Sequence, residues 1–250
     1  CETEVREGRG GPEGEVFLDM THLGKERILE KLPQIRELCI EFEGVDPIEE
    51  PVPIKPTAHY SMGGIHTDIN GQTEIEGIYA AGEAGCVSVN GANRLGGNSL
   101  LDILVFGKRA GKHALEYARS ASFTPVSSEQ EEKDTQMITT MMDGKGSGTT
   151  IADIRRAMGN LMAEKVGVYR NAADLESAIS ELTDLQEQFK QMRIQDKTKA
   201  FNTELVSALE LKNMLDLAET VTVGALERRE SRGAHTREDH PERDDENWLA

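Results

Sequence analysis

The chain has 250 residues, with 28 basic and 45 acidic side chains and a formal net charge of −17. This length allows a sizeable core in one or two domains. The acidity argues against a broad nucleic-acid surface, which needs clustered Lys and Arg, so no nucleic-acid partner is expected. No apolar run approaches the roughly 20 residues that span a bilayer, and no secretory signal is recognisable. The three cysteines lack CxxC spacing, which disfavours a zinc site or a disulfide framework.

In residues 1–56, the sequence predicts a strand, a helix broken by a proline and an extended segment that crosses to the next domain. A short apolar run at 17–20 indicates the strand. Apolar residues at helical spacing predict a helix near 24–42, in which Pro33 predicts a kink or a break. The proline-rich stretch 46–56 predicts an extended crossing and a domain boundary.

Residues 57–118 are rich in glycine. Strands are expected at 65–69 and 78–81, with an Asn-Gly turn following the first of them. A glycine-rich loop at 85–97 then leads into a helix at about 98–117. The side chains expected to bury this helix are Leu100, Leu101, Ile103, Leu104 and Phe106.

Residues 119–250 are expected to be helical after a polar stretch that ends in an exposed loop at 144–148. Three amphipathic helices with short connections predict an antiparallel bundle. These helices are expected near 149–164, 172–194 and 201–220. The tail, residues 224–250, is mostly charged and is expected to be irregular.

Two glycine-containing signals do not match nucleotide-binding motifs. The Gly8-Arg9-Gly10 sequence has Glu13 where a dinucleotide fingerprint needs its third glycine. In the loop at 144–148, Gly146 follows Lys145 where a phosphate-binding loop needs Ser or Thr. Both sequences are interpreted as ordinary turns.

The most informative sequence is Gly-Ala-Asn-Arg-Leu-Gly-Gly-Asn-Ser-Leu-Leu at 91–101. It places Arg94 in a loop of small residues just before a helix, where its guanidinium can hold a carboxylate through two hydrogen bonds. Free amides at Asn98, Ser99 and Leu100 are expected to form a helix N-terminus that favours a negative group. The alternative is an arginine that contacts a neighbouring loop, but the surrounding glycines favour close approach by a ligand.

Three other sites have a functional and an ordinary interpretation. His59 precedes a double-glycine turn and suits anion binding, although a surface or internally satisfied histidine is favoured from the residues alone. Glu83 follows a predicted strand, where a carboxylate can hold a sugar hydroxyl, but a solvated side chain is equally expected. The sequence 227–235, which includes Arg232 and His235, is interpreted as a solvated or structural ion-pair face.

Taken together, five sequences resemble the flavoprotein subunit of succinate dehydrogenase and fumarate reductase. They are His-Tyr-Ser-Met-Gly-Gly at 59–64, Ala-Ala-Gly-Glu at 80–83, the glycine-rich sequence at 91–101, Glu-Ser-Arg-Gly-Ala-His at 230–235 and Glu-Arg-Asp-Asp-Glu-Asn-Trp at 242–248. The resemblance runs over nearly the whole chain in one order, and the motifs are highly specific as a set.

The resemblance implies an α/β plus all-α fold. Residues 1–56 would be the end of a capping domain, and residues 57–118 the C-terminal part of a Rossmann-type FAD-binding domain. Residues 119–250 would form a helical C-terminal domain with a charged tail. Because the chain begins with Cys1 in sequence typical of the inside of a domain, we expect a fragment that lacks the upstream glycine fingerprint.

The resemblance also implies roles for particular residues. His59 and Arg94 would bind the carboxylates of succinate or fumarate. Glu83 would hold the ribityl region of FAD, and Ser99 and Leu100 would offer backbone amides to the flavin pyrimidine. No catalytic residue is expected in the chain, because the proton-delivering arginine of the family would lie upstream.

Two departures accompany this assignment. Arg6 and Arg9 do not match the family pattern for the proton-delivering arginine. Asn90 stands where many relatives have His, which puts a polar contact to the substrate in doubt.

The implied activity is oxidation of succinate to fumarate by hydride transfer to FAD. Electrons would pass to an iron–sulfur subunit, membrane anchor subunits and quinone, at the cytoplasmic face of the cell membrane. The alternatives are fumarate reduction by the same chemistry, an L-aspartate oxidase, and a non-catalytic interaction fragment. The chain alone is not expected to be active, because half of the flavin site would be missing.

Overall fold

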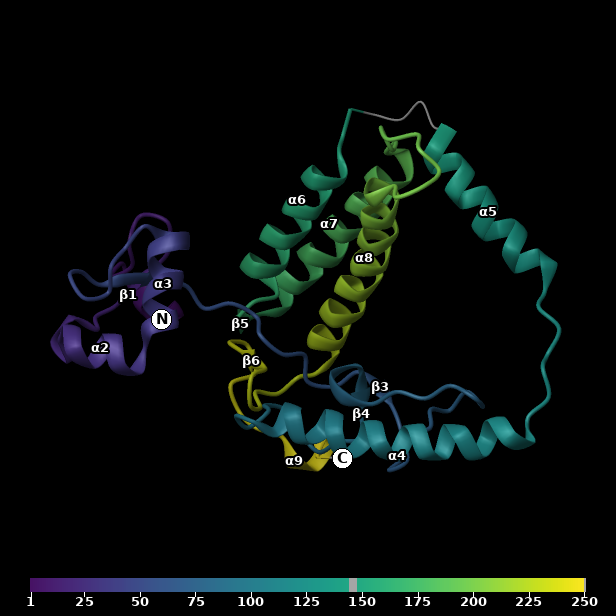
Figure 1. The fold of residues 1–250 in the computed structure, drawn as a ribbon, viewed down its shortest axis with the longest axis horizontal. Helices are drawn as coiled ribbons and strands as arrows, with labels where there is room; N and C mark the ends of the chain where they lie inside the picture. The colour runs from purple at the N-terminus through teal and green to yellow at the C-terminus, as the bar shows by residue number, and fades with distance from the viewer. Residues whose placement is uncertain (144–147, 250) are drawn as a thin grey trace. The chain divides into compact units, whose positions relative to one another are not determined.

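A computed structural model describes residues 1–143 and 148–249 of the chain (Figure 1). The chain divides into two compact units, Cys1–Ser61 and Met62–Ala250. The boundary lies slightly beyond the expected one at residue 56, and the assignment of the three expected domains stays a prediction. The loop expected at 144–148 lies, except for Gly148, outside the described residues.

The first unit is built around a two-stranded antiparallel sheet. Strand β1 (Val16–Leu18) pairs with β2 (Val52–Ile54), and Phe17 lies opposite Pro53. The proline-rich stretch expected to be only an extended crossing therefore contains a strand. Proline is tolerated there because the sheet has only two strands, so each strand is an edge.

The helix expected near 24–42 is broken, as Pro33 predicted. Helix α2 (Lys25–Lys31) ends just before Leu32. Helix α3 (Pro33–Leu38) then begins with proline at its first position, where a missing N–H costs no hydrogen bond. Further short helical segments are α1 (Glu2–Arg6), η1 (Thr21–Leu23) and η2 (Cys39–Glu43). Met20, Ile28 and Val52 form the buried core of this unit.

The second unit begins with little regular strand structure. Strand β3 (Ile65–His66) pairs in parallel with β4 (Gly85–Cys86). Residues 78–81, expected as a strand, form only an isolated bridge from Tyr79 to Gln72. A short 3-10 helix, η3 (Gly82–Ala84), follows and packs against the long helix α4 (Asn98–Ser120).

Helix α4 forms where expected, but its apolar face is not buried. Leu100 and Leu104 are 63% and 69% exposed, while the buried residues of the helix are Asp102 and Ala110. The expectation that the 100–106 side chains bury this helix is therefore wrong. The described residues supply mainly η3 as a packing partner, so most of the face has nothing to pack against.

The polar stretch after α4 contains a helix that the sequence analysis missed. Helix α5 (Ser128–Asp143) has Glu129 and Glu131 in its first turn, where acidic residues favour a helix N-terminus. Met141 near its end is buried in the main core. Only two of the helical turns carry apolar side chains, which is why the sequence resembles a polar linker.

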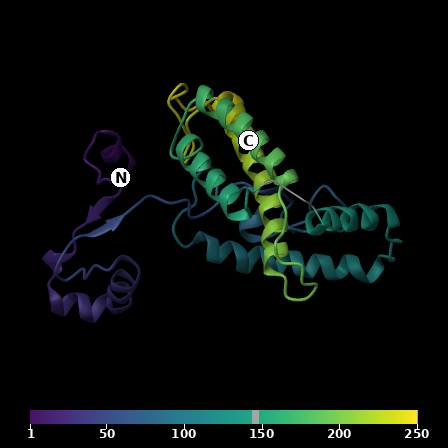
Figure 2. The ribbon, with the colours of Figure 1, turned by 90° about the horizontal axis from the view of Figure 1, so that it is seen from above.

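Three helices then pack side by side and form the main core (Figure 1). They are α6 (Ile151–Lys165), α7 (Ala172–Gln191) and α8 (Thr203–Glu227). Leu175, Leu182 and Leu211 are fully buried between them. Figure 2 shows the same three helices together from above. Thr150 caps α6 through a capping box, and the Asn202 side chain caps α8.

The charged tail is largely irregular after α8, as expected, but it contains two short regular elements. Strand β6 (Thr236–Arg237) pairs in parallel with β5 (Tyr169–Arg170), which precedes α7. A short helix, α9 (Asp245–Trp248), is capped at its N-terminus by Asp244, whose carboxylate accepts hydrogen bonds from two amides of the helix. Across residues 1–143 and 148–249, none of the helices combines the length and the apolar character that crossing a bilayer requires.

Candidate functional site

Arg94 lies in a glycine-rich loop that leads directly into α4. Gly91 and Gly97 adopt left-handed backbone conformations, with φ of +56° and +85°, which glycine adopts without strain. Among the described residues, nothing lies within 4 Å of where a Cβ would stand on Gly91, Gly96 or Gly97. The loop backbone is therefore open to a flat group that approaches it closely. The Arg94 side chain is half-buried.

The start of α4 is less free than the sequence suggested. The Asn98 amide donates to the Leu95 carbonyl at 3.1 Å, and the Leu100 amide donates to the Gly97 carbonyl at 3.2 Å. The expectation of free amides at these two residues is therefore wrong, because the loop turns tightly before the helix and satisfies them. A ligand at Leu100 would have to share its amide with the turn. The Ser99 side chain is half-buried beside them.

Glu83 lies in η3 and not at the end of a strand. Its neighbour Gly82 has φ of +74°, and a Cβ there would stand 2.7 Å from Ile103 of α4. Glycine is thus required for η3 to rest on α4. The same helix positions both the Glu83 turn and the Arg94 loop, while the Glu83 side chain is exposed.

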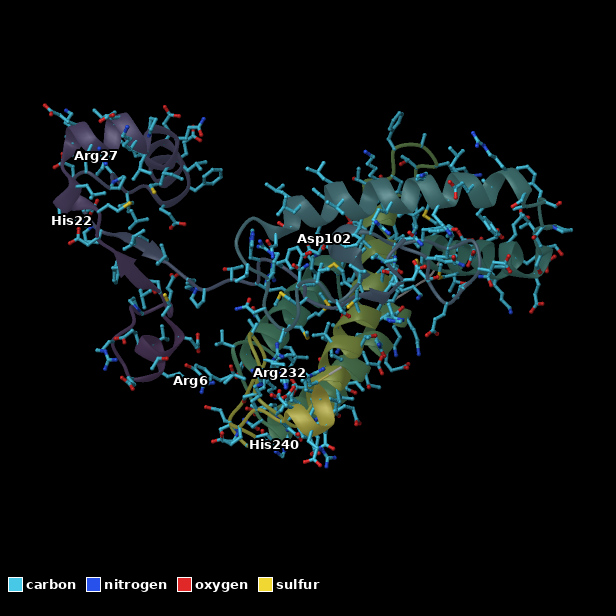
Figure 3. The ribbon with its side chains drawn as sticks, turned by 90° about the horizontal axis from the view of Figure 1, so that it is seen from below. Arg6, His22, Arg27, Asp102, Arg232 and His240 are labelled. Carbon is cyan, nitrogen blue, oxygen red and sulfur yellow. The ribbon has the colours of Figure 1, made fainter. Side chains whose placement is uncertain are left out.

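A buried aspartate near this loop was missed by the sequence analysis. Asp102 is only 5% exposed and accepts a hydrogen bond of 3.1 Å from the Asn90 side chain. Figure 3 labels Asp102 on α4. The sequence does contain a pattern that could have indicated this buried aspartate, since a single acidic residue interrupts the apolar run at 100–106. Asn90, which departs from the family pattern, therefore has a partner on α4.

His59 belongs to the first unit, in a segment with no regular secondary structure, and its side chain is exposed. Arg94, Glu83, Ser99 and Leu100 all belong to the second unit, around the N-terminal half of α4. The structure thus brings four of the five predicted residues to one region. Their roles, and the role of His59, stay predictions.

The tail contains a buried ion-pair cluster, in agreement with the structural interpretation of its charges. The Glu230 side chain is fully buried and accepts hydrogen bonds from Arg232 at 2.7 and 2.9 Å and from the Asp244 amide at 2.8 Å. The hydrogen bonds from Arg232 lower the pKa of the Glu230 carboxyl to about 2. Arg232 also contacts Asp245 at 2.7 Å (Figure 3).

A second buried charge joins the tail to the bundle. Arg237, which is 1% exposed, donates to the Ala225 and Leu226 carbonyls at the end of α8, at 2.8 and 2.9 Å. Asp239 accepts two hydrogen bonds from Arg237 and one from the Ala172 amide at the start of α7. The pair therefore satisfies the ends of two helices at once.

A cleft between α5, α7 and α8 lies apart from all five predicted residues. Its floor is apolar and its rim is charged. The apolar side chains include Met137, Phe189 and Leu215, and the rim includes Lys133 and Lys190. No predicted site residue lines this cleft, so it is not the candidate site.

Two family models match the chain in succession. Residues 2–100 match the family described as "FAD binding domain", and residues 155–250 match "Fumarate reductase flavoprotein C-term". The first match contains Arg94 and the other four predicted residues. The class of protein is therefore an FAD-binding flavoprotein, and the match supports FAD as its cofactor.

Individual relatives agree with these matches. The chain is 47% identical over 242 residues to a fumarate reductase flavoprotein subunit of Mycobacterium tuberculosis, covering 94% of this chain and 41% of the relative. It is 41% identical to a succinate dehydrogenase flavoprotein subunit of Rickettsia bellii, covering 98% and 43%. A solved structure of quinol fumarate reductase from E. coli superimposes with a TM-score of 0.92 at 43% identity, covering 99% and 43%.

The chain belongs to the family of fumarate reductase and succinate dehydrogenase flavoprotein subunits. This confirms the resemblance drawn from the motifs. The chain spans about two fifths of the length of the relatives that it matches. One of the two relatives is named a fumarate reductase subunit and the other a succinate dehydrogenase subunit.

Proposed function

We propose that the holoenzyme containing this chain interconverts succinate and fumarate, and we take succinate oxidation as the proposed direction. The observation that carries this proposal is Arg94, which lies in an open glycine loop before α4 and within the match to an FAD-binding domain. FAD, when bound, supplies a two-electron acceptor for the hydride. Fumarate reduction is the same chemistry in reverse.

Arg94 would bind one carboxylate of the dicarboxylate. Its guanidinium is planar and always charged, so it holds a carboxylate by two parallel hydrogen bonds and fixes its orientation. His59 would bind the other carboxylate. With both carboxylates held, the two central carbons of the substrate have a fixed orientation. This orientation reduces the entropy that the substrate loses on reaching the transition state.

Three further residues would contact the cofactor. Glu83 would accept hydrogen bonds from ribityl hydroxyls of FAD. Ser99 and Leu100 would offer amides at the α4 N-terminus, whose dipole favours negative charge on a bound ring. The loop glycines fit this role, because the open space beside Gly96 and Gly97 admits a flat group against the backbone.

The proposal extends to partners and location. As the resemblance of the motifs implies, electrons would pass to an iron–sulfur subunit and then to quinone through membrane anchor subunits. The subunit would then be peripheral, at the cytoplasmic face of the cell membrane. The 43% identity and shared fold with a quinol fumarate reductase over 99% of this chain support the quinone-linked part of this proposal.

The test replaces the proposed substrate ligand in the holoenzyme. Arg94→Ala should lower kcat/KM for succinate and for fumarate by at least about 100-fold, because a charge-assisted pair of hydrogen bonds contributes roughly 3 kcal/mol or more. Bound FAD should remain at the wild-type level. The matched control is Arg156→Ala, which removes an arginine paired with Asp153 on the surface of α6.

Near-normal turnover of Arg94→Ala would contradict the assignment of this residue. Loss of FAD together with activity would also contradict it, since Arg94 would then support the cofactor instead of the substrate. Measuring both directions with matched electron donors and acceptors decides between succinate oxidation and fumarate reduction as the faster reaction.

A further inference from the structure

A turn in the tail touches the loop that carries Arg94. Residues Arg232–His235, called the tail turn here, bring the Ala234 amide within hydrogen-bond distance of the Ala92 carbonyl, at 3.0 Å. Ala92 lies two residues before Arg94. The loop and the tail turn are far apart in sequence, and both belong to the second unit.

The contact requires glycine at position 233. Gly233 has φ of +60°, and a Cβ there would stand 2.5 Å from the Ala92 carbonyl oxygen and 2.6 Å from its carbon. These distances are too short for any side chain, and the obstacle is backbone that cannot rotate away. Gly233 therefore lets two backbone segments meet directly.

The tail turn is itself held in place on one side by charge. The Arg232 and His235 backbones exchange two hydrogen bonds, of 2.8 and 3.0 Å, which close the turn. Arg232 is fixed by the two hydrogen bonds from its guanidinium to the buried Glu230. Both partners are largely removed from solvent, so this pair is more rigid than a surface ion pair.

The other side of the tail turn is held by His235. The His235 Nε2 donates to the Arg228 carbonyl at 3.0 Å, because a carbonyl can only accept. The Nδ1 atom then accepts from Arg170 at 2.8 Å, so the ring is neutral. Arg170 belongs to β5, which precedes α7, and the tail turn is thereby joined to the helical bundle.

We propose that the tail turn positions Arg94, with Gly233 as the positioning residue that lets the turn reach Ala92. This inference rests on the proposed function, because it assigns the turn to the site that binds the dicarboxylate. Arg94 itself touches the substrate, while Gly233 acts through the Ala92 backbone. A displacement of the loop would misalign the guanidinium and weaken its paired hydrogen bonds to the carboxylate.

The test uses Gly233→Ala in the holoenzyme and malonate as the probe, a dicarboxylate that lacks the pair of adjacent methylene carbons to be oxidised. The malonate Kd, followed by the flavin absorbance, should rise at least about tenfold, since misplacement by about 1 Å costs up to roughly 100-fold. KM for succinate should rise with it. The FAD content should match wild type, and amide hydrogen exchange at 92–97 should accelerate.

Two control variants separate the backbone contact from general strain. Gly44→Ala has a similar φ of +70° but open space around the new Cβ, so it should leave the malonate Kd unchanged. Gly233→Asn tolerates the left-handed conformation but still carries a Cβ. It should therefore fail to restore malonate binding.

If Gly233→Ala does not yield folded holoenzyme, Arg232→Lys replaces it. Lysine keeps the charge but loses the paired hydrogen bonds to Glu230, and the malonate Kd should rise at least about threefold. A malonate Kd within twofold of wild type in the folded variant would overturn the inference while leaving the proposed function standing. Wild-type holoenzyme that binds no malonate would instead overturn the proposed function, and this inference with it.

Discussion

Arg94 and Gly233 illustrate which residues a sequence can single out as candidates for a functional role. Arg94 was recognisable because glycines surround it and a helix follows, a pattern with a local physical meaning. Gly233 has no such pattern, since its importance comes from the Ala92 carbonyl, which lies far away along the chain. Contacts between distant segments depend on the tertiary fold and cannot be inferred from local spacing.

Arg237 is predicted to contribute most to stability among the tail arginines. Arg237→Ala would leave two carbonyls at the end of α8 without their donor and Asp239 without its partner. Breaking a buried pair on one side costs about 3–5 kcal/mol. Urea unfolding of the holoenzyme measures this loss.

The control for this prediction is Arg243→Ala, because Arg243 is an exposed arginine paired with Asp245 in the same tail. Its unfolding midpoint should stay close to wild type. Equal losses in both variants would show that the buried position of Arg237 has no special effect.

Glu230 gives the tail a defined dependence on pH. Its pKa falls from an ordinary value of 4.5 to about 2 in the folded chain, so the ionised carboxylate favours folding. That stabilisation is fully present above about pH 4.5 and is lost as the pH falls towards 2. Glu230→Gln should therefore be destabilised relative to wild type at pH 7, with a smaller difference at pH 3.

Urea unfolding midpoints at the two pH values measure this difference. Glu187→Gln serves as the comparison, since Glu187 makes an exposed pair with Lys190, and its unfolding midpoint at pH 7 should stay close to wild type. A Glu230→Gln difference that is the same at pH 7 and pH 3 would refute the linkage.

At the scale of elements, long amphipathic helices were predicted best. Helices α6, α7 and α8 appear where apolar residues recur at helical spacing, because that spacing buries one face of each helix. Helix α5 was missed, since its sequence is mostly polar. The prediction of a strand at 78–81 was wrong, because a short apolar run does not form a strand without a neighbouring strand to pair with.

Helix α4 shows the limit of the same reasoning. Its position was predicted from the glycines before it and the apolar run within it. Its burial was not predicted correctly, because burial depends on which segments pack against the helix. Among the described residues, little beyond η3 packs against α4. The same holds for Leu100, whose side chain is exposed although its backbone belongs to the candidate site.

Two leucines in the helical bundle test the assignment of its core. Leu182 of α7 is fully buried, whereas Leu217 of α8 is 63% exposed. Leu182→Ala should lower the free energy of unfolding by about 2–5 kcal/mol, from lost burial and the cavity that remains. Leu217→Ala deletes the same atoms at a position exposed to solvent, so it should change the free energy of unfolding little. Thermal unfolding measures the stability of the two variants. Equal losses of stability would contradict the burial of Leu182 in the core between the helices.

At the scale of the whole molecule, the family was predictable from sequence because five motifs occur in one order. Each motif alone has an ordinary interpretation, as His59 and Glu83 show. Their order carries the specificity, and the matches at 2–100 and 155–250 agree with it. The direction of the reaction was not predictable, since it depends on reduction potentials of the partner groups and not on the substrate ligands.

The central claim is that this chain contributes to a flavin site that exchanges electrons with succinate and fumarate. The most direct measurement is the flavin absorbance of the purified holoenzyme under anaerobic conditions. Succinate should bleach the absorbance, fumarate should restore it, and L-aspartate should leave it unchanged. Bleaching by L-aspartate but not by succinate, or an absorbance that responds to neither, would contradict the claim.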